Sequence, residues 1–238
     1  MIDIHSHLLY GVDDGAKNIQ ESLDMLMDAK KQGVEGMILT PHYRHGMFGY
    51  QKEQIEENFI ELKNKASDIG VKLYLGTEYH VNSMIIENLK SGRCHTLADT
   101  SYVLAEYKPE TEFSYIKASV QDLLFRGYIP IVVHVERYAC MDNLKNVALL
   151  REIGVMIQVN ADAVIGKDGL RAKGYVKKLL KRGYVDFVGS DCHGMKQRKS
   201  NMGKCRDYLY KKYDEHYVVK ILEGNARMIL ESMEADYL

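Results

Sequence analysis

The sequence predicts an α/β fold in which parallel strands alternate with helices, either closed as a TIM-like barrel or open as a doubly wound sheet. Three observations predict it. Short apolar runs rich in β-branched residues recur along the chain, and longer segments with helical spacing separate them. Several of these segments end in a glycine that the next apolar run follows at once. No linker or shift in composition interrupts residues 1–238, so we expect a single domain.

Seven apolar runs have the length and composition of strands. They are Met1 to Ile4, Gly36 to Thr40, Val71 to Leu75, Tyr102 to Ala105, Pro130 to Val133, Val155 to Val159 and Phe187 to Gly189.

Five segments between these runs have helical spacing, near residues 18–32, 52–68, 113–126, 142–152 and 170–182. Each is followed by a glycine suited to a left-handed C-cap: Gly33, Gly70, Gly127, Gly154 and Gly183. Beyond about residue 200 only helical patterns remain, at Tyr208 to Lys212 and Tyr217 to Leu222. We expect this part of the chain to cap the last strand.

Composition excludes several classes of function. The 32 basic and 33 acidic side chains give a net charge of -1, so no global field draws the protein to nucleic acid or an anionic membrane. No apolar run approaches the roughly 20 residues of a membrane span, and the N-terminus lacks the features of a signal peptide. We therefore expect a cytoplasmic protein without membrane insertion. The four cysteines form no CxxC pair, which argues against a disulfide framework or a thiolate zinc site.

Metal-binding residue types follow six of the seven predicted strands. The C-terminal ends of the strands of a parallel barrel open on one face, where the active site lies, so these residues should meet there. Asp14, in the loop after the first strand, adds a ninth candidate. The set is His5, His7, Asp14, His42, Glu78, Glu106, His134, Asp191 and His193.

This set predicts a cluster of metal ions. His5 and His7 are two residues apart on an extended segment, so their side chains project from the same side and can bind one ion. Nine nitrogen and oxygen ligands exceed what one ion can use, so we expect two or three divalent ions. Imidazole and carboxylate without thiolate indicate manganese, zinc or iron.

Six segments carry a resemblance to a known family. The chain resembles the PHP-type tyrosine-protein phosphatases of bacterial capsule and exopolysaccharide operons, the CpsB/YwqE type, in order from residue 1 to about residue 225. The segments are His5-Ser6-His7, Val12-Asp13-Asp14-Gly15-Ala16, Thr40-Pro41-His42, Gly76-Thr77-Glu78, His134-Val135-Glu136-Arg137 and Ser190-Asp191-Cys192-His193. The family's usual HPER and SDAH read HVER and SDCH here. Neither change removes a ligand, but loss of the proline could move Arg137.

The resemblance implies a distorted seven-stranded barrel of the PHP fold with a three-metal centre, most commonly manganese. In the family's pattern the first ion is held by His5, His7, Glu78 and Asp191, the second by Glu78, Glu106 and His134, and the third by Asp14, His42 and His193. The implied substrate is a phosphotyrosine-bearing protein, notably the tyrosine kinase of the same operon.

The expected mechanism is attack on phosphorus by a metal-activated hydroxide. Because the phenol of tyrosine has a pKa near 10, its phenolate leaves without a strong general acid, and we assign none. Arg137, three residues after a ligand, and Arg198, after the last two ligands, are expected to grip the phosphoryl oxygens.

Other interpretations remain open at this stage. The metal site could act on a small metabolite such as histidinol phosphate or on a nucleic-acid end, or the protein could be a regulatory binding protein. Cys192 to Arg198 also matches the C-x5-R loop of cysteine-dependent phosphatases. Tyr43, Tyr79 and Tyr107 each follow a candidate ligand, and strand alternation predicts that they pack outward against the helices.

Overall fold

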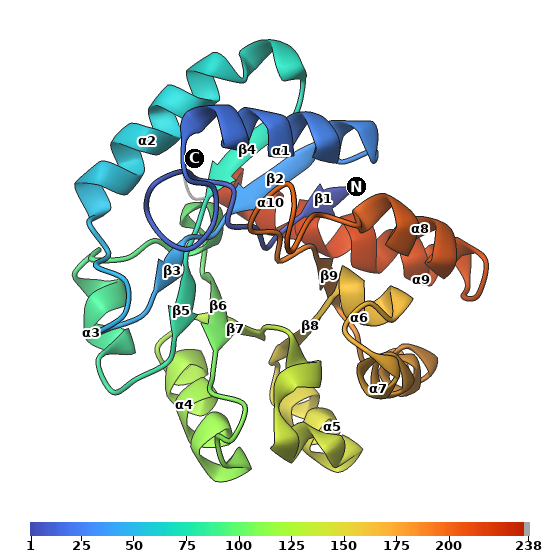
Figure 1. The fold of residues 1–238 in the computed structure, drawn as a ribbon. Helices are drawn as coiled ribbons and strands as arrows, with labels where there is room; N and C mark the ends of the chain where they lie inside the picture. The colour runs from blue at the N-terminus through green and yellow to red at the C-terminus, as the bar shows by residue number, and fades with distance from the viewer. Residues whose placement is uncertain (236–238) are drawn as a thin grey trace.

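The computed structural model describes residues 1–235 and contains a ring of parallel strands surrounded by helices (Figure 1). Seven strands follow one another along the chain: β1 (Ile2–Asp3), β2 (Gly36–Leu39), β4 (Lys72–Leu75), β6 (Tyr102–Glu106), β7 (Ile129–Val132), β8 (Met156–Asn160) and β9 (Phe187–Gly189). Two short strands, β3 (His42–Tyr43) and β5 (Glu78–His80), continue β2 and β4 after two-residue interruptions. Neighbours pair in parallel in the orders β1-β2-β4 and β3-β5-β6-β7-β8-β9.

Backbone hydrogen bonds close the ring between its first and last strands. Beyond the ends of β1 and β9, the Asp191 amide donates to the His5 carbonyl and the His7 amide to the Cys192 carbonyl, both at 2.9 Å. Across the two interruptions, the amides of Gly76 and Glu78 donate to the carbonyls of Leu39 and Pro41. The structure is therefore a distorted seven-stranded barrel, which the family resemblance implies, and not the open doubly wound sheet that the sequence patterns also allowed.

The helices lie outside the ring. They are α1 (Ile19–Lys31), α2 (Lys52–Lys65), α3 (Ile85–Lys90), α4 (Phe113–Phe125), α5 (Leu144–Glu152), α6 (Ala161–Ile165), α7 (Leu170–Lys181), α8 (Met202–Tyr210), α9 (Glu215–Val219) and α10 (Asn225–Ala235), with a π-helical turn (Lys220–Gly224) before α10. The five predicted helices are confirmed to within a few residues, whereas α3 and α6 had no clear sequence signal. All five predicted cap glycines have positive φ, between 64° and 97°.

Side chains of each strand alternate between an inner and an outer apolar layer. On β6, Leu104 belongs to the inner cluster, while Val103 and Ala105 pack outward among the helices. Ala226 and Ile229 of α10 join the inner cluster, and α10 contacts β1 and the turn that precedes β6. The C-terminal helix therefore covers the N-terminal end of the barrel and leaves the other end open. Within the described residues, no helix is long and apolar enough to cross a membrane.

Candidate metal centre

All nine predicted metal ligands lie together at the C-terminal ends of the strands, with Glu78 in the middle. One oxygen of Glu78 is 2.9 Å from His134 Nε2 and 3.3 Å from His5 Nε2. The other is 2.8 Å from His42 Nδ1 and 3.2 Å from His7 Nε2. Glu78 is 1% exposed, so these groups meet away from bulk water.

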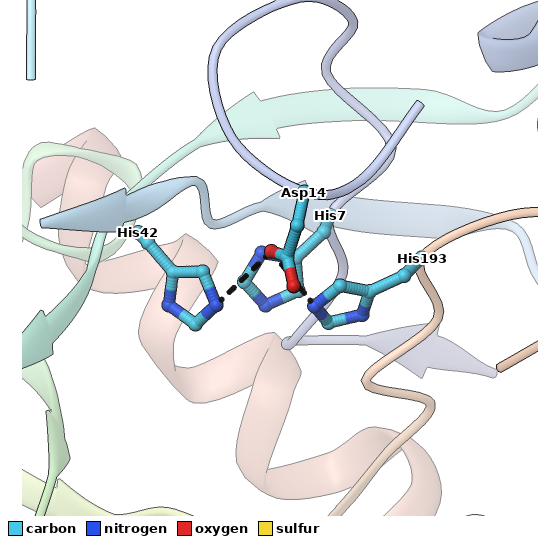
Figure 2. A group of neighbouring side chains, drawn as sticks. All are labelled: His7, Asp14, His42 and His193. Atoms are coloured by element: carbon cyan, nitrogen blue, oxygen red, sulfur yellow. Dashed lines mark ion pairs between the residues drawn. The ribbon is translucent and has the colours of Figure 1, made fainter. Parts of the chain in front are cut away.

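Three overlapping groups of side chains have ligand atoms within 4.8 Å of one another. In the first, Asp14 reaches down from the loop after β1 between His42 and His193, with His7 behind it (Figure 2). Asp14 Oδ1 is 3.5 Å from Nε2 of both of its neighbours. The other two groups are His5, His7 and Glu78, and His42, Glu78 and Glu106.

The donor set fits divalent cations because several buried polar atoms in it have no hydrogen-bond partner. These atoms are His5 Nδ1, His42 Nδ1, Glu78 Oε2 and His193 Nε2. His42 Nδ1 and Glu78 Oε2 lie 2.8 Å apart but without the geometry of a hydrogen bond. Ligand atoms at about 2.1 Å from one ion lie about 3 Å from each other, so this spacing matches two ligands of a shared cation.

Mutual charge keeps the cluster ionised despite its burial. Burial alone would raise the pKa of Glu78, but His5 and His42 outweigh it and hold that pKa well below its usual value. Burial alone would lower the pKa of His7, but Asp13 and Glu78 outweigh it and raise that pKa well above its usual value. In this state protons on His5 and His7, the two imidazoles whose pKa values are raised, balance the carboxylates, and bound cations would replace those protons.

A local irregularity after β1 turns His5 and His7 into the site. Ile2 and Ile4 belong to the inner cluster, so regular alternation would point His5 outward. The buried carboxylate of Asp3 interrupts the ladder at this point, since its Oδ1 accepts from the amides of His5 and Ser190. After this point the alternation of inward and outward side chains is shifted by one residue. The imidazoles of His5 and His7 therefore both face inward, with their Nε2 atoms 3.4 Å apart.

Asp13 is a site residue that sequence reasoning missed. Its Oδ2 is 2.8 Å from His7 Nδ1 and accepts from the His42 amide at 3.0 Å, while Oδ1 accepts from the Gly15 amide at 2.9 Å. Asp13 therefore orients His7 and ties the Asp14 loop to the strand end. A carboxylate is a common partner of a ligating histidine, but the burial of Asp13 and its contact with His7, which distinguish it from Asp14, exist only in the folded chain.

Two further residues that sequence reasoning passed over support the ligands. His80 Nδ1 lies 3.1 Å from Glu106 Oε2, and its position two residues after Glu78 on β5 places it on the same face. Asn160, at the end of β8, donates from Nδ2 to Asp191 Oδ2 at 2.8 Å. The predicted strand Val155 to Val159 is the one that no metal ligand follows. It is followed instead by Asn160, which donates a hydrogen bond to the proposed ligand Asp191.

Arg137 and Arg198 both reach the centre through Asp191. Arg137 Nη2 donates to Asp191 Oδ2 at 2.7 Å, and Arg198 Nη2 donates to Oδ1 at 2.8 Å. Their side chains remain 38% and 42% exposed, so each guanidinium lies at the rim. Val135, in place of the family's usual proline, has not moved Arg137 away from the site.

The thiol of Cys192 is not placed as a nucleophile. Cys192 is 2% exposed and packs in the outer apolar layer, and burial raises its pKa to about 12. Reactive thiolates need a lowered pKa and access to substrate, so the C-x5-R interpretation is disfavoured.

The three tyrosines that follow ligands pack outward, as predicted. Tyr43 stacks on Tyr79 with ring centroids 4.6 Å apart, and Tyr107 is 3% exposed. All three belong to or pack against the outer apolar layer.

Comparison with known proteins decides the family. Residues 1–231 match the family model described as "Capsular polysaccharide synthesis, CpsB/CapC". The chain belongs to the CpsB/CapC family. It is 32% identical to the tyrosine-protein phosphatase CpsB of Streptococcus pneumoniae, over 97% of this chain and 98% of that protein. It is 28% identical to the tyrosine-protein phosphatase YwqE of Bacillus subtilis, over 98% of this chain and 92% of that protein.

Solved structures agree with this assignment to the CpsB/CapC family. The crystal structures of YwqE from B. subtilis and CpsB from S. pneumoniae, described as unique metal-dependent tyrosine phosphatases, include a match with a TM-score of 0.90 at 28% identity, covering 98% of this chain and 95% of that one. The phosphotriesterase homology protein of Escherichia coli matches with a TM-score of 0.60 at 13% identity, covering 96% of this chain and 97% of that one. The second likeness concerns the fold alone.

Proposed function

We propose that this CpsB/CapC family member is a metal-dependent protein-tyrosine phosphatase. The observation that carries the proposal is the convergence of imidazoles and carboxylates around the buried Glu78, with unpartnered ligand atoms facing one another. Relatives that align along nearly the whole chain are tyrosine-protein phosphatases, and those with the matching fold are metal-dependent.

The proposed ligands are the nine residues predicted from the sequence. The spacing of the side chains supports an ion between His5, His7 and Glu78, and another between Asp14, His42 and His193. His134 and Glu106, on the remaining side of Glu78, would complete a third position with it. We propose two or three ions with manganese preferred over zinc or iron. Such ions lower the pKa of water and neutralise phosphoryl charge.

The chain's own groups bind and orient the substrate. Arg137 and Arg198 project from the rim beside Asp191 and present planar N–H donors suited to phosphoryl oxygens. Asp13 holds the Nε2 atom of His7 toward Glu78. No side chain is assigned as general acid, because a phenolate leaves readily.

The proposed physiological substrate is a phosphotyrosine-bearing protein, in particular a tyrosine kinase of capsular or exopolysaccharide synthesis. The family's connection with capsular polysaccharide synthesis supports this choice. A cytoplasmic location and the absence of nucleic-acid partners remain predictions from the sequence.

The test is phosphatase activity under control of the metal content. We expect turnover of p-nitrophenyl phosphate and a phosphotyrosyl peptide with added manganese, loss of both on chelation, and recovery when the metal is restored. Histidinol phosphate in the same panel should be a poor substrate. If it were turned over far better than the peptide, the metal site would stand but the proposed substrate class would not.

A variant pair assigns the activity to the site. Glu78→Gln should lose bound manganese, measured by elemental analysis, together with activity, because it removes the charge that faces four imidazoles. Glu152→Gln changes an exposed carboxylate on α5 in the same way and should keep both. Activity that survives in Glu78→Gln would contradict the proposal.

A further inference from the structure

A hollow of about 670 Å³ lies beside the candidate metal centre, on the side of β3, β5 and β6. His80 lines it and at the same time contacts Glu106, one of the proposed ligands, so the hollow adjoins the centre. In Figure 1 these strands lie next to α3, and the turn after α3 supplies Arg93 to the hollow.

Three of the residues that line the hollow follow a proposed metal ligand by two positions in the sequence. Arg44 follows His42 by two residues, His80 follows Glu78, and Lys108 follows Glu106. His80 lies on β5 opposite Glu106 of β6, whereas Arg44 and Lys108 follow the last residues of β3 and β6 by one and two positions. Because β3, β5 and β6 pair in parallel, the ends of these strands lie side by side, and the chain beyond them lines the hollow.

The charge in this hollow is of one sign. Arg44, Arg93 and Lys108 line it, and among the described residues no aspartate or glutamate does. Among residues 1–233, whose side chains are described, none of these three cations has a carboxylate within ion-pair distance. The other hollow beside the centre differs, because Asp14, Glu21 and Asp24 line it together with its cations. An uncompensated basic concavity attracts anions.

Apolar groups flank the cations. Met47 and Met84 line the hollow and are 61% and 43% exposed, so two apolar side chains are accessible beside the cations. Flexible methionines next to cations suit a peptide segment that has both apolar and anionic side chains. They do not suit a free inorganic anion.

We propose that this hollow is a docking subsite for an anionic side chain of the phosphoprotein substrate, close in sequence to the phosphotyrosine that enters the metal centre. The anion is a carboxylate or a second phosphoryl group, which share the oxygen chemistry that arginine and lysine bind. The inference rests on the proposed phosphatase function and adds to it a preference for acidic or multiply phosphorylated segments.

The test compares matched phosphotyrosyl peptides that differ at one position. That position holds alanine, glutamate or phosphoserine and is moved step by step along either side of the phosphotyrosine. At the best position, kcat/KM of the unsubstituted protein should favour an anionic peptide over the alanine peptide by up to about fivefold, since one exposed charge pair is worth up to about fivefold in affinity. The preference should shrink at high salt.

Variants then locate the preference. The combined substitution R44A, R93A and K108A should bring the ratio of anionic to alanine peptide close to one, and Lys177→Ala, an exposed lysine on α7, should leave the ratio intact. Using R93K in place of R93A in the combined variant returns a charge to this position and should recover part of the preference. Circular dichroism and thermal unfolding would check that the triple variant is folded.

The outcomes separate this inference from the proposed function. An unchanged ratio in the triple variant, or no preference in the unsubstituted protein, would overturn the docking subsite while phosphatase activity stands. No turnover of any peptide with manganese present would count against the phosphatase function. The subsite would then be tested by binding alone. Fluorescence anisotropy would measure the affinity of the same peptides carrying a non-hydrolysable phosphonate in place of the phosphotyrosine. A larger gain from glutamate than from phosphoserine would identify carboxylates as the preferred group.

Discussion

Replacing Asp13 with asparagine should weaken metal binding although Asp13 is not a proposed ligand. The carboxylate accepts three hydrogen bonds: from the His7 ring and the His42 amide at Oδ2, and from the Gly15 amide at Oδ1. By accepting from Nδ1 of His7, it keeps a proton on that nitrogen, so that Nε2, which faces Glu78, is the atom whose proton a metal ion would replace.

An asparagine can satisfy only part of this arrangement. If its oxygen takes the place of Oδ2, its amino group faces the Gly15 amide, and one buried donor is left unpaired. If its amino group takes the place of Oδ2, it faces the His42 amide and favours the His7 tautomer whose Nε2 carries the proton, which blocks a ligand atom. An unsatisfied buried polar group costs about 1–3 kcal/mol, and loss of such an orienting partner typically lowers metal affinity by about 10- to 100-fold.

The assay is the manganese dissociation constant of Asp13→Asn, measured by calorimetric titration and by recovery of phosphatase activity as metal is added back. The matched control is Asp122→Asn, which removes an exposed carboxylate whose partner is Arg126 one turn away on α4. An exposed pair of this kind is worth about 0.3–0.5 kcal/mol and should not affect the metal. Equal manganese affinity in Asp13→Asn and in the unsubstituted protein, with both folded, would refute the orienting role.

Three further predictions follow from the site. Cys192→Ala should keep kcat/KM within about twofold, because the thiol is buried away from the centre, and lower the free energy of unfolding by about 1 kcal/mol in urea denaturation. Arg137→Lys should lower kcat/KM for phosphotyrosyl peptides by about tenfold or more while manganese content is unchanged, since an ammonium lacks the planar fork. The pKa of His7 is raised above 6.5, so its proton stabilises the metal-free protein below that pH, and this stability is lost as pH rises through the raised pKa. Manganese must displace the same proton, so its affinity should rise from pH 6 to pH 8 with proton release in calorimetry, and a flat affinity would contradict this.

The order of strands and helices could be predicted because local signals repeat. Each of the five predicted helices is followed within five residues by a glycine with positive φ, and each of the seven predicted strands is an apolar run too short for a helix. The short helices α3 and α6 could not be predicted from the sequence. A helix of five or six residues spans little more than one turn, and its stability comes from tertiary packing. The breaks between β2 and β3 and between β4 and β5 could not be predicted either, because an interruption of two residues is too short to show a change in the hydrophobic pattern.

Membership of the site was easier to predict than its supporting contacts. Ligand types recur at strand ends, and the barrel brings strand ends together whatever the details of each loop. Asp13 contacts His7 and Asn160 contacts Asp191 across 6 and 31 residues of sequence, and only the folded chain brings such partners together. A carboxylate or amide near a ligand is common, so residue type alone could not separate Asp13 from its neighbour Asp14.

His134 belongs to the predicted ligand set because of its residue type, although regular strand geometry argues against an inward position. Ile131 and Val133 face the interior of the barrel, so a continued strand would send His134 outward into the helical layer. The chain instead adopts φ 33° and ψ 52° at His134, a left-handed conformation that costs a non-glycine residue about 1–3 kcal/mol. The turn brings Nε2 to 2.9 Å from Glu78, and the Tyr138 hydroxyl, 3.2 Å from Nδ1, holds the ring in place. Asp191 and Arg198 also have positive φ, so three of the five non-glycine residues with this conformation among residues 1–235 are proposed site residues. Strained backbone conformations are thus concentrated at the proposed site. This indicates that they position the site residues and do not serve the stability of the barrel.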